Sequence, residues 1–192
     1  MRPKNKIGLA LLCVAAFNNV RPALARVYLS QKEALAIAFP KGQTTERRTG
    51  YLSKDEAKHA AALAKAPVDS LVWTHYVGKS KEKIAGYAYF ETHVVRSMPE
   101  TFMAVLDAKG RLRFVEILSF NEPDDYFPSK AWLKQFEGKN LADGLMVRRD
   151  LRNITGASLT SNALSEGVRR ILAVHALLHP DTPTKFKQEE KK

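Results

Sequence analysis

Four apolar segments in the middle of the chain constrain its fold more than any other feature. They are rich in β-branched and aromatic residues with partial alternation of apolar and polar positions, as half-buried strands are. The turn Asp107-Ala108-Lys109-Gly110 has hairpin composition, with Gly110 at its strained corner. Strands joined by short turns pair antiparallel, so we expect a twisted, mainly antiparallel sheet. The four segments cover residues 71–77, 83–95, 100–106 and 112–120.

Helical patterns flank these strands, which makes α+β, with helices packed on the sheet, the predicted fold class. Ser30 is a suitable N-cap for the first helix, and the pair Ser53 and Glu56 forms a capping box that starts the second. We expect the Ser161 hydroxyl to cap the last helix, and residues 41–50 to form a polar loop or short strand. The expected helices cover residues 28–39, 54–65, 129–136 and 162–178.

Residues 1–25 have the pattern of a secretory signal peptide. Three basic residues precede an apolar run at residues 7–17, and a small-residue site ends at Ala25. Cleavage there would leave a mature chain without cysteine, because Cys13 is the only one in the sequence. Such a chain has no disulfides, thiol chemistry, iron–sulfur cluster or c-type haem attachment. We expect export to the periplasm or the outer face of the cytoplasmic membrane, either by cleavage or with the segment kept as an anchor.

The charge of the chain favours acidic partners or anionic lipid headgroups. The net charge of +11 falls to +7 when the four basic residues of the signal are removed. Nucleic acid is the usual partner of so basic a chain, but export and the lack of a nucleic-acid motif argue against it. We divide the mature chain into an N-terminal helical segment (26–67) packed on the main domain (68–180), followed by a charged, disordered tail (181–192).

Residues 153–161 form a motif of small and hydroxylated residues just before the last predicted helix. Gly156 can adopt backbone angles closed to other residues, and Ala157 adds little bulk. A helix N-terminus offers unpaired N–H groups and the positive end of the helix dipole, which suit a phosphate. The motif therefore predicts an open turn that holds a phosphate beside a hydroxyl. An ordinary loop with an N-cap is the simpler interpretation of the same residues.

This motif resembles the flavin-attachment sequence of the FMN-binding domain family, which includes the extracytoplasmic flavin subunits of the Rnf and Na⁺-pumping NADH:quinone reductase complexes. The family pattern is Asp-x-x-Ser/Thr-Gly-Ala-Thr/Ser, usually followed by Leu/Ile-Thr-Ser. A flavin transferase there esterifies the phosphate of FMN onto the hydroxyl after Gly-Ala. The resemblance extends over roughly residues 51–178 and implies an FMN-binding-domain-like fold with covalent FMN as the cofactor.

Carried over residue by residue, the resemblance makes Ser158 the flavin acceptor. Arg152 stands where the family has its acidic residue, which would weaken recognition by a transferase that reads that position. The remaining motif residues are expected to bind the cofactor, and they are Thr155, Gly156, Ala157, Leu159 and Thr160.

The loop after the last predicted strand is a second candidate for flavin contact. Glu122, Pro123 and Tyr126 occupy the place where family members have a segment that lines the flavin, so the resemblance implies that they form a wall against the ring. A turn with a surface acid and packed aromatics explains these residues equally well.

Several other residues have simpler interpretations than a site. Trp132 and Phe136 share a helix face and are expected in the core. His175 and His179 have the i, i+4 spacing of a metal-binding pair but no third ligand, so we expect them to be solvated or to cap the helix. Ser158 lacks the Gly-x-Ser-x-Gly turn and a supporting acid–base pair, which argues against a hydrolase.

Together these patterns predict an exported electron carrier with FMN esterified to Ser158. The partners implied are a flavin transferase and either a membrane reductase complex or an extracytoplasmic cytochrome. The alternative hypothesis is a non-catalytic binding or assembly module of the same fold, with loose flavin or none, which Arg152 favours.

Overall fold

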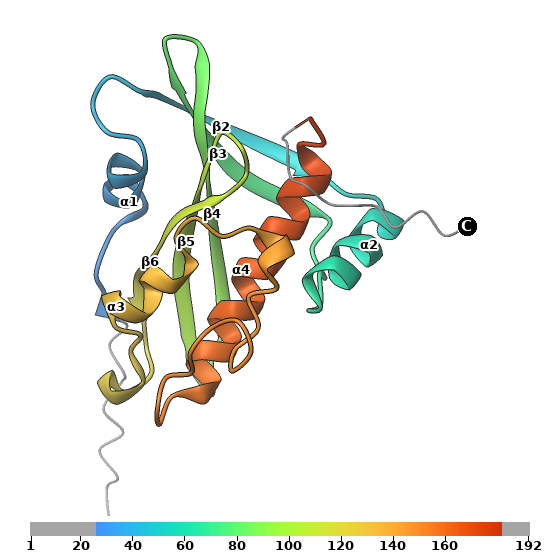
Figure 1. Ribbon diagram of the computed structural model, residues 1–192. Helices are drawn as coiled ribbons and strands as arrows, with labels where there is room; N and C mark the ends of the chain where they lie inside the picture. Colours follow the sequence, from blue (N-terminus) through green and yellow to red (C-terminus); the bar gives the residue numbers. More distant parts are fainter. Residues whose placement is uncertain (1–25, 182–192) are drawn as a thin grey trace, which may run out of the picture.

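The computed structural model describes residues 26–181, so the predicted signal peptide and residues 182–192 of the predicted tail lie outside it. The strands are β1 (Arg26–Val27), β2 (Thr44–Tyr51), β3 (Val72–Ser80), β4 (Lys83–Val94), β5 (Pro99–Asp107) and β6 (Leu112–Phe120). They form one sheet in the order β1-β6-β5-β4-β3-β2 (Figure 1). Every neighbouring pair is antiparallel, and β2 to β6 follow one another as a meander. The sheet and its helices confirm the predicted α+β class.

Four α-helices accompany the sheet in the described part of the chain. They are α1 (Gln31–Ala38), α2 (Lys54–Ala64), α3 (Lys130–Leu133) and α4 (Ser158–Leu178), with 3-10 helices η1 (Asp124–Tyr126), η2 (Lys134–Phe136) and η3 (Leu141–Asp143). The capping boxes at Ser30 and Ser53 are both present: each serine hydroxyl accepts from the N–H of the Glu three residues later, and that carboxylate accepts from the serine N–H. The prediction of α1 and α2 from these residues is therefore confirmed.

The two faces of the sheet support separate apolar cores, because side chains alternate between the faces along each strand. Along β4, Tyr87 and Tyr89 belong to the core under α2 and α4, whereas Ala88 between them belongs to the core under α1. Figure 1 shows α1 and α4 on opposite sides of the sheet. The predicted core positions of α4 are confirmed, since Leu164 and Val168 are fully buried.

Close contact between α4 and the sheet depends on a glycine in the helix. A Cβ atom added at Gly167 would lie 2.6 Å from Glu91 Oε1 and 2.9 Å from the Phe102 ring. The absence of a side chain thus lets the helix axis approach β4 and β5 more closely than an alanine would allow. No helix within residues 26–181 is long and apolar enough to cross a membrane.

Two boundaries differ from the sequence-based expectation. Residues 44–51 form a full strand, β2, paired with β3 over its whole length. The last helix begins at Ser158, four residues before the predicted start at Asn162. The candidate acceptor therefore lies in the first turn of α4 rather than in the loop before it.

Candidate functional site

A cleft of about 210 Å³ lies where the β4–β5 turn, η1 and the start of α4 meet. It contains most of the residues that the sequence singled out, although they come from segments about 30 residues apart. Tyr126 from η1 faces the motif at the start of α4, and the β4–β5 turn supplies the third wall. The lining residues are Val95, Arg96, Tyr126, Gly156, Ala157, Ser158, Leu159 and Thr160.

Ser158 occupies the first position of α4, where backbone N–H groups have no acceptor within the helix. The N-cap, Ala157, has no side chain that could cap them. The first helical bond runs from Ser161 N to Ala157 O at 3.1 Å, so the earlier N–H groups remain at the helix end. The Ser158 hydroxyl is half-buried and lies in the positive potential of a 21-residue helix.

Asn153 holds the Ser158 side chain in place. Its Nδ2 donates a hydrogen bond of 2.8 Å to Ser158 Oγ, and its Oδ1 accepts one of 2.6 Å from Ser161 Oγ. Because Ser158 Oγ is the acceptor, its own proton remains free to leave or to bind a ligand. Ser161 was expected to cap the helix, but this expectation is wrong. Its hydroxyl is buried in the first turn and bonds to Asn153 instead.

The turn before α4 is open. Gly156 has φ of 80°, which favours glycine, and a Cβ at this position would meet no atom within 4 Å. Thr155 beside it is exposed and does not line the cleft. The predicted open turn is thus present, with space around its glycine rather than packed side chains.

Glu122 and Pro123 are not at the cleft surface. Pro123 is exposed at the N-cap of η1, and Glu122 is buried beneath the β4–β5 turn. The Glu122 Oε1 atom accepts hydrogen bonds from the backbone N–H groups of Arg96 (3.1 Å), Ser97 (2.6 Å) and Met98 (2.8 Å). These bonds, that of Ser97 above all, hold the pKa of Glu122 below its usual value. The carboxylate therefore fixes the turn that carries Arg96.

Trp132 anchors the segment that leads into the motif. Its ring is buried against Phe136, which confirms the predicted core role of this pair. Trp132 Nε1 donates to the Arg152 carbonyl at 2.6 Å, and Gln135 Oε1 accepts from the Arg152 N–H at 2.8 Å. The backbone of Arg152 is thus fixed, whereas its side chain is exposed.

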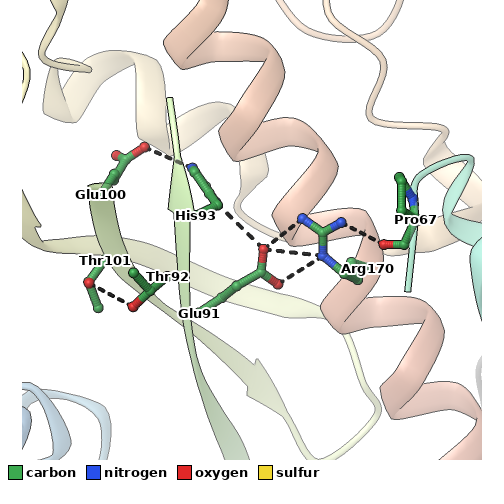
Figure 2. Close-up of polar contacts among 7 residues, drawn as sticks. All are labelled: Pro67, Glu91, Thr92, His93, Glu100, Thr101 and Arg170. Atoms are coloured by element: carbon green, nitrogen blue, oxygen red, sulfur yellow. Dashed lines mark hydrogen bonds and ion pairs between the residues drawn. The ribbon is translucent and has the colours of Figure 1, made fainter. Parts of the chain in front are cut away.

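A charged network beneath α4 was missed in the sequence. Arg170 of α4 pairs with Glu91 of β4 at 2.9 Å and also donates to the Pro67 carbonyl at 2.6 Å. His93 lies between two carboxylates, with Nδ1 3.5 Å from Glu91 Oε1 and Nε2 3.1 Å from Glu100 Oε2 (Figure 2). Glu91 and His93 alternate along one face of the strand. Solvent-exposed charged residues often show the same alternation, so the pattern only weakly indicates a buried network.

The network is arranged for structure rather than catalysis. Burial alone would lower the pKa of His93, but the hydrogen bond to Glu100 and the nearby Glu91 carboxylate raise it to about 9. Burial raises the pKa of Glu100, which is fully enclosed. Both ring nitrogens of His93 face carboxylates, Nε2 in a hydrogen bond to Glu100 and Nδ1 at 3.5 Å from Glu91.

Three histidines meet at the other end of α4. His175 is fully buried, and its Nδ1 lies 2.8 Å from the Tyr89 hydroxyl; His179 Nε2 lies 3.2 Å from His75 Nε2. The expectation that His175 is solvated or caps the helix is therefore wrong. Burial, with the neighbouring imidazoles, lowers the pKa of His175 to about 3 and that of His179 to about 4. The positive charge of Arg48 also lowers the pKa values of His179 and His75, so protonation of these imidazoles is disfavoured.

Within residues 26–181 no three His, Cys, Asp or Glu side chains are arranged to hold a metal ion. Comparison with protein-family models and with curated proteins found no match to this chain. The cleft at the start of α4 is the place where motif, hydroxyl and aromatic side chain come together, and it is the candidate functional site.

Proposed function

We propose that the protein carries FMN in a phosphoester to Ser158 and relays electrons between redox partners. The observation that carries the proposal is the Ser158 hydroxyl, which lies in the cleft at the first turn of α4 with Arg96 and Tyr126 around it. The flavin supplies the redox chemistry, and the protein supplies attachment and orientation. The proposed fold family is that of the FMN-binding domains.

The residues of the cleft fit a flavin phosphate. Asn153 donates to Ser158 Oγ and leaves the hydroxyl proton free. With a flavin transferase, the Oγ–P bond would form as the bond from phosphorus to the leaving group of the flavin-nucleotide donor breaks, and the hydroxyl proton would be released. The first-turn N–H groups of α4 and the Arg96 side chain favour the negative charge of a phosphate bound to Ser158 Oγ. Tyr126 offers an aromatic face beside it.

The size of the cleft fits an accessible cofactor. Sites that enclose a small molecule have volumes of roughly 300–1,000 Å³. A cleft of about 210 Å³ takes only part of FMN, so the rest of the flavin would lie at the protein surface. An electron carrier needs such exposure, because its partners must approach the ring. The proposed partners are a flavin transferase and a membrane reductase complex or extracytoplasmic cytochrome, and the proposed location is outside the cytoplasm.

Co-expression with a flavin transferase tests the attachment. The wild-type protein should retain one FMN after denaturation and desalting, with the added mass on the peptide that contains Ser158. Ser158→Ala should abolish the covalent flavin, whereas Ser158→Thr should keep it because the hydroxyl is retained. Thr155→Ala is the matched control, since that hydroxyl is exposed but outside the cleft. Covalent flavin that persists in Ser158→Ala would refute the assignment of the acceptor.

The second candidate function is a binding or assembly module without covalent flavin. It is favoured by Arg152, whose exposed side chain stands in the place of the family's acid. If a transferase reads that position, Arg152→Asp should raise the fraction of modified protein, measured by mass spectrometry. A wild-type chain that stays free of flavin beside a competent transferase would favour the module.

A further inference from the structure

We propose that Arg96 binds the phosphate of the flavin in this cleft, so that the site selects phosphorylated flavins over riboflavin, and that Glu122 positions Arg96 for this task. The inference rests on the proposed function, since it names the group that recognises the ligand of the same site. Neither residue belongs to the attachment motif: Arg96 lies in the β4–β5 turn, and Glu122 lies between β6 and η1, beneath that turn.

Most hydrogen-bond donors of the Arg96 guanidinium have no partner among the described residues. It is the only charged residue among the eight that line the cleft. Its guanidinium makes one long contact, 3.4 Å from Nη1 to the Tyr126 hydroxyl, and no carboxylate within residues 26–181 pairs with it. Arg111 and Arg170, by contrast, are each held by a carboxylate at 2.8–2.9 Å. A guanidinium with free donors beside a hydroxyl acceptor is suited to a phosphate, which it can bind with two parallel hydrogen bonds.

Glu122 explains why this arginine stands at the cleft. One carboxylate oxygen gathers three successive backbone N–H groups, from Arg96 to Met98, at 2.6–3.1 Å. Such a buried, charge-assisted cluster fixes the turn, and its loss leaves an orphaned set of donors. With the backbone fixed, Arg96 lines the same cleft as Ser158, and its guanidinium lies within reach of the Tyr126 hydroxyl. Glu122 is thus a positioning residue that does not line the cleft itself.

The experiment compares FMN with riboflavin, which lacks the phosphate, on protein made without a transferase so that Ser158 is unmodified. Dissociation constants are measured by quenching of flavin fluorescence at low and high salt. Wild type should bind FMN more tightly than riboflavin. Arg96→Ala should weaken FMN binding about tenfold and leave riboflavin binding unchanged. Tenfold is the lower end of the effect of a charged hydrogen bond, because Arg96 is exposed. Arg96→Lys should retain part of the preference, and added salt should weaken FMN binding more in wild type and Arg96→Lys than in Arg96→Ala.

Two further variants make the test specific. Arg152→Ala is the matched control, because that exposed arginine lies next to the motif but outside the cleft. It should leave the preference for FMN intact. Glu122→Gln keeps the shape of the side chain and removes its charge, so it should reduce the preference for FMN while riboflavin binding stays unchanged.

The inference is overturned if Arg96→Ala leaves the ratio of FMN to riboflavin affinity unaltered, or if Arg152→Ala lowers it as much. It is also overturned if wild type binds FMN no more tightly than riboflavin. These affinities are read on unmodified protein, whereas the proposed function fails on the absence of covalent flavin after co-expression. The two failures are therefore distinguishable.

Discussion

The histidine cluster at the end of α4 predicts a loss of stability in mild acid. His175 and His179 are neutral in the folded protein, with pKa values lowered to about 3 and about 4. In the unfolded chain their pKa values are about 6.5. Below that pH the unfolded state binds more protons than the folded state, so the free energy of unfolding falls as the pH falls. The stabilisation is fully present above pH 6.5 and is lost towards the folded-state pKa values.

The size of this loss in free energy of unfolding can be calculated, because each buried imidazole takes up one proton when the chain unfolds below about pH 6.5. Each contributes about 1.4 kcal/mol per pH unit below about pH 6.5. Between pH 7 and pH 5, His175 accounts for about 2 kcal/mol, and the partly exposed His179, discounted for solvent screening, for about 1 kcal/mol. His93 acts in the opposite sense, because its pKa is raised to about 9 and its contribution is lost as the pH rises from 6.5 towards 9. Stability should therefore be greatest near neutral pH.

Urea unfolding at pH 7, 6 and 5 measures this loss, and a double variant isolates one part of it. Tyr89→Phe with His175→Leu removes both partners of the buried hydrogen bond at similar volume, which keeps the core filled. The variant should lose about 2 kcal/mol less than wild type between pH 7 and pH 5. Comparing the two proteins cancels the contributions of His93 and the carboxylates. Equal losses would show that His175 titrates normally, and the reasoning from its burial would fail.

Three further predictions concern the site, the core and the processing of the chain. Asn153→Ala should lower the covalent flavin several-fold by releasing the Ser158 hydroxyl, as read by mass spectrometry, and an unchanged yield would mean that the hydroxyl needs no positioning. Gly167→Ala should lower the free energy of unfolding by about 1–3 kcal/mol, measured in urea, because its methyl group meets Phe102; a neutral result would show that α4 moves aside easily. N-terminal sequencing of the native protein should return Arg26, and Met1 would refute cleavage of the signal.

Local chemistry explains which parts of the fold the sequence predicted. The capping boxes of α1 and α2 lie within four consecutive residues each, and the strands show their period over a few positions. The start of α4 was placed too late because its N-cap, Ala157, offers no capping side chain. The core role of Trp132 followed from the helical spacing alone.

Long-range contacts explain what the sequence did not predict. Glu122 reads as a surface acid in a turn, since its partners at Arg96 to Met98 come from a hairpin about 25 residues earlier. The burial of His175 depends on β4, whose Tyr87 and Tyr89 rings pack against it. The motif and Tyr126 could be found separately, but only the fold joins them in one cleft with Arg96.

The outer strand β2 has a charged composition that disfavours pairing of the sheet edge with a second sheet. β2 lies at one edge of the sheet, where unpaired backbone groups are a template for another extended chain. Its residues Glu46, Arg47 and Arg48 are exposed, and Lys79 of β3 pairs with Glu46 at 2.8 Å. A second copy that docked on this edge would have to strip water from that charged row, at a cost that its hydrogen bonds would not recover. The opposite edge, β1, has only two residues. The charged residues on β2 contribute nothing to either core. Their effect is to disfavour the edge-to-edge pairing of sheets that leads to aggregation.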